Sequence, residues 1–305
     1  MDAGQAVRVG GQAVLEGVMM RAGDRACVAV RRPDGTIETR PVPIPGWASE
    51  TARIPLVRGL AALAEAMTVG VGALRWSEER ALPPRSDGRK PAPVWVLLLI
   101  ALSAVVAMVV VIPSALAGLA PHGWFAPVET VSRVVVVGSY VRLAARRREV
   151  RRVFEYHGAE HLVVAAHEAG HELTPEVVRQ GSIRHPRCGT SFILVIAAVA
   201  AAVHPLLPVD PWGDRLLSRL VVVPLVAMVA YEVLTGLGAL AARRPGGLVE
   251  RMLLWPQRFT TRWPDDDQLE VAVVALRGAL EPSTVPAPDA TNAPTTVVIG
   301  ASTPS

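Results

Sequence analysis

Four apolar runs separated by polar segments are the strongest pattern along the sequence. They cover residues 94–119, 128–143, 192–207 and 216–242. The first run is long enough to cross about 30 Å of hydrocarbon as a helix. Pro113 within it is tolerated in a membrane helix, because neighbouring groups satisfy the freed backbone atoms. The pattern predicts about four membrane-spanning helices.

The second run is the weakest candidate for a span, because Glu129 and Arg133 lie near its start. Their spacing of four residues places both side chains on one face of a helix, where the two charges can pair. We therefore keep this run as a span and expect an ion pair near the membrane interface.

The distribution of basic residues fixes the orientation of the spans. Arg and Lys gather before the first run, between the second and third runs and after the fourth, whereas residues 121–127 and 208–214 contain none. Four spans place every basic cluster in the cytosol, as the positive-inside rule expects, whereas three spans would leave one cluster outside. We predict a multi-pass protein with both termini in the cytosol.

The composition agrees with a membrane protein. Hydrophobic residues make up 51% of the 305 positions, and the mean hydropathy is +0.35, which is high for a soluble domain. A net charge of +4 would also suit nucleic acid. The arginines cluster beside the apolar runs, so we expect the lipid bilayer, and no nucleic acid, as a partner. Cys27 and Cys188 lie far apart in sequence and suggest no disulfide framework.

The N-terminal part of the chain is polar. Residues 1–55 form a cytosolic β-rich segment, in which 27–30 and 37–42 flank the turn sequence Pro33-Asp34-Gly35-Thr36 and predict a β-hairpin. Residues 56–90 contain a helix of mixed polarity and a linker. This helix either lies along the membrane interface or packs on the cytosolic domain.

Residues 91–281 form the four-span membrane region. The region includes a His-rich cytosolic loop at 146–190 and ends in an amphipathic cytosolic helix at 268–280, capped by the aspartates at 265–267. The Pro/Thr/Ala composition of 282–305 predicts a disordered tail. The predicted fold class is mainly α, a polytopic membrane helical bundle with a small β-hairpin element at the N-terminus.

Candidate chemistry is concentrated in the string Tyr156-His157-Gly158-Ala159-Glu160-His161. On a helix, His157 and His161 project from one face, one turn apart, so both can reach one ion at about 2.0–2.1 Å. Glu160 lies beside them and could activate a water molecule as a general base. The alternative is a polar helix whose histidines only form hydrogen bonds.

A second string, His167-Glu168-Ala169-Gly170-His171, matches the H-E-x-x-H pattern of metalloproteases. Gly170 is a typical helix terminator, and Thr174-Pro175 would begin a new helix. We therefore expect His171 to lie outside the helix and the protease pattern to be accidental. Glu168 shares the face of His157 and His161 but lies about 10 Å further along the axis, which leaves it an accessory or substrate-facing role.

The string His185-Pro186-Arg187-Cys188 precedes the third apolar run. A His and a Cys separated by two residues can chelate one ion from a tight turn. Together with His157 and His161 they would complete a tetrahedral set, and mixed nitrogen and sulfur ligands favour Zn²⁺, although Fe²⁺ or Co²⁺ would accept them. The alternative is a Pro-Arg turn with an incidental thiol.

Two further carboxylates are accessory candidates. Glu232 lies inside the fourth run, where an ionisable group faces a partner or a cavity. It either anchors the bundle through an Arg or a histidine, or lines the site. Glu16 lies among glycines that permit close backbone approach.

Several of these strings, namely 10–21, 156–161, 185–192, Tyr231-Glu232 and 264–276, resemble the YqhQ-type bacterial membrane proteins. This family has no known function, and its members are often described as predicted metal-dependent enzymes. The resemblance implies a multi-span protein of the bacterial cell membrane with a metal site at His157, His161, His185 and Cys188. It implies no substrate.

Two hypotheses from different classes follow. In the first, the protein is a metal-dependent hydrolase at the cytosolic membrane face, with Glu160 as the catalytic base. In the second, it is a non-catalytic membrane scaffold whose metal fastens the cytosolic loop to the bundle. Four protein ligands would close the metal site, as in structural zinc sites, so catalysis requires one position to be exchangeable.

Overall fold

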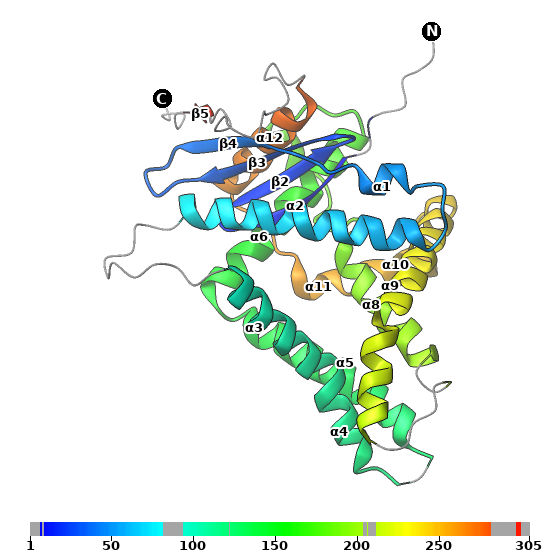
Figure 1. Ribbon diagram of the computed structural model, residues 1–305. Helices are drawn as coiled ribbons and strands as arrows, with labels where there is room; N and C mark the ends of the chain where they lie inside the picture. The colour runs from blue at the N-terminus through cyan, green and yellow to red at the C-terminus, as the bar shows by residue number, and fades with distance from the viewer. Residues whose placement is uncertain are drawn as a thin grey trace, which may run out of the picture.

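Two regions meet in the molecule. The computed structural model describes residues 7, 9–81, 94–121, 123–203, 206, 212–281 and 297–299. At one end, an antiparallel sheet is packed between helices, and a group of long apolar helices projects away from it (Figure 1). The predicted class, mainly helical with an N-terminal β element, is confirmed at this level.

The sheet is an antiparallel meander of β1 (Val9–Val14), β2 (Gly17–Ala22), β3 (Arg25–Arg31), β4 (Ile37–Val42) and β5 (Val297–Ile299), in that order. The predicted hairpin is the β3–β4 pair, in which Val30 lies opposite Glu38. Its turn is stabilised by Asp34 Oδ1, which accepts a hydrogen bond of 3.0 Å from the Thr36 amide. The first hairpin, β1–β2, was not predicted, because its glycines interrupt the alternation of apolar and polar positions.

The segment expected to be disordered, 282–305, lies largely outside the described residues. Within it, β5 differs from the expectation, because it pairs with β4 and places Val298 opposite Glu38. The physical reason is local composition: Val297-Val298-Ile299 are β-branched residues that favour an extended backbone.

Both faces of the sheet are covered by helices. Along β2 and β3, successive side chains alternate between the two faces. Met19 and Val28 pack with Val69 and Trp76 of α2 (Val57–Ala81). The opposite face packs on α6 (Arg148–Glu168) and α12 (Asp266–Leu280). The predicted acid-capped helix is α12, where the Asp265 side chain and Gln268 form a capping box.

Helix α2 corresponds to the predicted helix of mixed polarity at 56–90. Figure 1 shows it running beneath the sheet, across the direction of the projecting helices. Its C-terminal half packs on the sheet through Val69, Ala73 and Trp76. Near its N-terminus, Gly59 lies against Tyr231 of α9 (Trp212–Arg243). These contacts show that α2 packs on the sheet, as one of the two predicted alternatives expects.

Each of the four predicted apolar runs contains helix, but the helix bounds differ from the expectation, and residues 204–205 and 207 of the third run lie outside the described part of the chain. The first is divided into α3 (Val94–Val106), a π-helical turn η1 (Ala107–Val111) and α4 (Ile112–Gly118). The second is α5 (Phe125–Ala144), the third is α8 (Gly189–Val203), and the fourth is α9.

Among the described residues, two helical stretches are long and apolar enough to cross a membrane, Val57–Ala81 and Val221–Arg243. The four-span count is thus not established by helix length. The described apolar helix Gly189–Val203 is short, and the charged pair of α5 lowers that helix's hydropathy.

That charged pair is buried between α5 and the α3–α4 helix. Glu129 Oε1 lies 3.3 Å from Arg133 Nη2, as predicted from their spacing, and both side chains are about 5% exposed or less. Ser114 Oγ donates a hydrogen bond of 2.8 Å to Glu129, and Arg133 Nε donates one of 2.7 Å to the Val109 carbonyl. Val109 lies in the π-helical turn, so the arginine bonds to the backbone at the point where this helix departs from regular α geometry.

Short helices complete the described fold. They are α1 (Trp47–Glu50), α7 (Pro175–Val178), α10 (Leu248–Leu254) and α11 (Gln257–Thr260). The segment after α11 runs back across α6, where the Arg262 amide donates a hydrogen bond of 2.9 Å to the Phe154 carbonyl. A Cβ at Gly158 of α6 would lie 2.0 Å from the Arg262 carbonyl oxygen. This contact therefore requires glycine at position 158.

Gly158→Ala should lower stability by about 1–3 kcal/mol, because the added methyl group forces the 261–265 segment away from α6. Gly138→Ala in α5 is the matched control, since a Cβ there meets nothing within 4 Å, and its better helix propensity should leave stability unchanged or slightly higher. Thermal unfolding of the detergent-purified proteins, followed by circular dichroism, measures both. Equal melting temperatures of the two variants would contradict a close contact between Gly158 and the Arg262 carbonyl.

Candidate metal centre

Two histidines on α6 are held in a defined orientation by backbone carbonyls from other elements. His157 Nδ1 donates to the Thr260 carbonyl at 2.9 Å, and His161 Nδ1 donates to the Ile183 carbonyl at 2.7 Å. A ring whose Nδ1 carries the proton presents the lone pair of Nε2. Metal-binding histidines are typically oriented in this way, by a hydrogen bond from the nitrogen that does not bind the ion.

Cys188 approaches the same point from the start of α8. Its Sγ lies 3.2 Å from His157 Nε2, and the ligand atoms of His157, His161 and Cys188 all lie within 4.8 Å of one another. A nitrogen at ~2.0 Å and a sulfur at ~2.3 Å from one tetrahedral ion are about 3.5 Å apart. The three residues form a group that could hold a metal ion, and their donor set suits Zn²⁺.

Glu160 lies beside this group on the adjoining side of α6. Its Oε2 is 4.0 Å from His157 Nε2 and 3.9 Å from His161 Nε2, and its residue is 7% exposed. A Cβ on Gly11 of β1 would come within 3.0 Å of Glu160 Cγ. The glycine therefore lets the first strand pack directly against the carboxylate side chain.

His185 lies next to the group but is engaged elsewhere. Its Nε2 is 3.1 Å from Glu168 Oε2, and its Nδ1 accepts a hydrogen bond of 3.3 Å from the Arg187 amide. Burial lowers the pKa of His185 below its ordinary value, which favours the neutral ring that this pattern requires. The structure thus brings together three of the four expected ligands, His157, His161 and Cys188. The fourth, His185, forms a hydrogen bond with Glu168 instead.

The turn that carries His185 and Cys188 is fixed by Gln257 of α11. The fully buried Gln257 side chain accepts from the His185 amide at 2.9 Å and donates to the His185 carbonyl at 2.8 Å. Thr260, one turn later, supplies the carbonyl for His157. Neither residue is marked by a motif in the sequence, because the groups that Gln257 and Thr260 contact lie 72 and 103 residues away along the chain.

The protease-like pentapeptide does not form a second site. Helix α6 ends at Glu168, Gly170 has a left-handed φ of 70°, and the exposed His171 donates its amide to the Ala166 carbonyl at 2.9 Å. This is the expected glycine-terminated helix end. Thr174 then precedes α7, with Pro175 in its first turn, as predicted.

The two accessory carboxylates lie in ion pairs with arginines. Glu16, at a positive φ of 49° in the β1–β2 turn, pairs with Arg152 through both carboxylate oxygens. Glu232 of α9 pairs in the same way with Arg58 of α2 and accepts a hydrogen bond of 3.0 Å from the Leu56 amide. Glu16 therefore ties the sheet to α6, and Glu232 ties α9 to α2.

These features define a mainly helical protein with an N-terminal antiparallel sheet and a His/Cys group of metal-binding type. The family described as "Protein of unknown function (DUF1385)" matches residues 54–282. The chain is also 33% identical, over 292 residues, to the uncharacterized protein YqhQ of Bacillus subtilis (strain 168), covering 89% of this chain and 92% of that protein. The chain therefore belongs to this YqhQ-type family of unknown function. No solved structure matches it.

The placement of His185 yields a prediction for metal content. His161→Ala and Cys188→Ser each remove a ligand and should lower the zinc retained after purification without chelator by at least about tenfold. His185→Gln leaves the three-residue group intact and should retain close to the wild-type amount. Elemental analysis by plasma mass spectrometry measures the zinc per chain. Equal zinc loss in the His185 and His161 variants would instead favour the four-ligand site.

Proposed function

We propose that the protein is a zinc-dependent hydrolase that acts at the cytosolic face of the bacterial cell membrane. The proposal rests on the arrangement of the centre. The ligand atoms of His157, His161 and Cys188 lie close together, whereas His185 forms a hydrogen bond with Glu168. The Glu160 carboxylate lies within 4.0 Å of Nε2 of both His157 and His161. Three protein ligands leave a position for water or substrate, which is the arrangement of catalytic zinc sites.

Each residue of the centre has a separate role in this proposal. His157, His161 and Cys188 would hold the ion, which would supply Lewis acidity to a bound substrate. Glu160 Oε2 accepts the proton of the attacking water and later delivers it to the leaving group. The carbonyls of Thr260 and Ile183 keep the two imidazoles in the required tautomer.

Exposed apolar side chains, together with the distribution of charge, support the proposed membrane placement. In the projecting helices, large apolar residues are exposed on the outer surface, among them Ile100, Leu116, Val135 and Val221. Such a surface is unfavourable in water and suits lipid. We propose that α3–α4, α5, α8 and α9 are the four spans, and that α2 lies along the cytosolic surface below the sheet. This arrangement keeps the basic clusters in the cytosol.

A second function, a scaffold with a structural metal, is supported by the connectivity of the centre. His157 and His161 lie on α6, which packs on the sheet, whereas Cys188 immediately precedes the apolar helix α8. A metal at this point would fasten the sheet-containing region to the apolar helices. In that case Glu160 would be dispensable.

Glu160→Gln separates the two functions, because it removes the base and retains the shape of the side chain. Zinc content and melting temperature should remain at the wild-type values, while hydrolysis of a panel of chromogenic carboxylic and phosphoric esters should fall by about 10²–10⁴-fold. Cys188→Ser should lower both zinc content and activity. A wild-type protein that holds zinc but cleaves no ester, and melts much lower after chelation, would favour the scaffold.

A further inference from the structure

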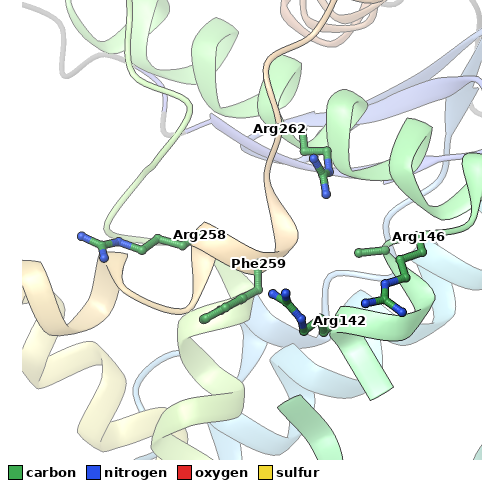
Figure 2. Close-up of a pocket in the computed structure, with 6 residues that line it drawn as sticks. Arg142, Arg146, Arg258, Phe259 and Arg262 are labelled. Carbon is green, nitrogen blue, oxygen red and sulfur yellow. The ribbon is translucent and has the colours of Figure 1, made fainter. Parts of the chain in front are cut away.

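An arginine-rich pocket of about 360 Å³ lies where the cytosolic end of α5 meets α11. It is lined by Arg142, Ala145, Arg146, Arg258, Phe259 and Arg262. Figure 2 shows the side chains of Arg142, Arg146 and Arg262 on one side of Phe259, with their guanidinium groups turned towards a common space, and Arg258 extending to the other side. The pocket therefore gathers positive charge around one aromatic ring.

The lining contains no acidic residue, and within the described part of the chain none of these four arginine side chains is found in an ion pair or hydrogen bond. Some other arginines of the protein are paired, such as Arg152 with Glu16 and Arg58 with Glu232. The pocket differs in that four arginines line one space with no carboxylate among them. Unpaired like charges repel one another and are stabilised by an anion between them. A guanidinium presents a planar set of donors that matches the oxygens of a phosphate group.

The surroundings of the pocket indicate where that phosphate comes from. Trp255, Phe259 and Trp263 are exposed beside the arginines, and aromatic side chains of this kind are enriched at the headgroup level of membranes. The pocket also adjoins the metal centre, because Phe259 and Arg262 flank the Thr260–Thr261 segment whose Thr260 carbonyl orients His157.

We infer that this pocket binds a phosphate group, and specifically the phosphate of a membrane-lipid headgroup. The inference relies on the proposed membrane placement for the source of the phosphate, but it does not depend on the metal or on hydrolysis. A soluble phosphate ester offers the same chemistry, so the source is decided by experiment. If the centre is hydrolytic, a lipid held here would be presented beside it.

The test uses full-length protein in a non-ionic detergent and isothermal titration calorimetry. The three probes are dihexanoyl phosphatidylglycerol, glycerol 3-phosphate and inorganic phosphate. The double variant Arg142→Gln/Arg262→Gln removes two charges from the pocket. The matched control, Arg243→Gln/Arg251→Gln, removes two exposed charges that do not line it. Wild type and control should bind the short-chain lipid alike, and the pocket variant should bind it at least roughly tenfold more weakly.

Stronger binding of the lipid than of glycerol 3-phosphate supports the headgroup assignment. Equal binding of both, lost in the pocket variant, supports the phosphate site but overturns the lipid source. Binding of all three probes that is unchanged in the pocket variant, or no binding to the wild type, overturns the inference. The zinc content of the same preparations, measured in parallel, separates this result from a failure of the proposed metal chemistry.

Discussion

Two hydrogen bonds, in which backbone carbonyls orient the imidazoles of His157 and His161, govern the arrangement of the candidate metal centre. Thr260 and Ile183 belong to segments far from α6 in sequence, yet each must place a carbonyl oxygen within hydrogen-bond distance of an Nδ1 atom. Three features make this possible. Gly158 lets the segment after α11 approach α6, Gln257 fixes the turn before Cys188, and the Arg262 amide bonds back to α6. Without these contacts the histidines would be free to rotate, and any metal affinity would fall accordingly.

Ion pairs join the elements around this centre. Glu16–Arg152 connects the first hairpin to α6, and Glu232–Arg58 connects α9 to α2. Glu129–Arg133 is a pair within α5, and its two side chains reach the α3–α4 helix through hydrogen bonds to Ser114 and Val109. Of these three pairs, Glu129–Arg133 is the buried one, and breaking it would leave an uncompensated charge. The other two are partly exposed, so each contributes little net stability. Their effect here is to specify which helices pack together. The arginines around Phe259 differ from all of these, since they gather without a carboxylate in the lining of their pocket.

Local signals in the sequence predicted much of the fold. The Pro-Asp-Gly-Thr turn predicted the β3–β4 hairpin, the aspartates at 265–267 predicted the start of α12, and Gly170 predicted the end of α6. The β1–β2 hairpin was missed because glycines obscure its alternation, and β5 was missed because a short strand in a Pro/Thr-rich segment depends on the edge it pairs with. In the candidate centre, helical spacing alone placed His157 and His161 together. Three other features of the centre depend on tertiary contacts, which residue spacing does not encode. They are the hydrogen bond of His185 to Glu168, the contact of Gln257 with the His185 backbone, and the contact of the Thr260 carbonyl with His157.

We propose that His157, His161 and Cys188 bind one zinc ion and leave a further position open. X-ray absorption spectroscopy at the zinc edge, on protein loaded with one equivalent of zinc, measures the ligand set itself. We expect one sulfur neighbour at about 2.3 Å, imidazole scattering from two histidines at about 2.0–2.1 Å and a further light-atom neighbour that is not imidazole. A spectrum without sulfur, or one that requires three imidazoles in addition to the sulfur, would contradict the open three-ligand centre.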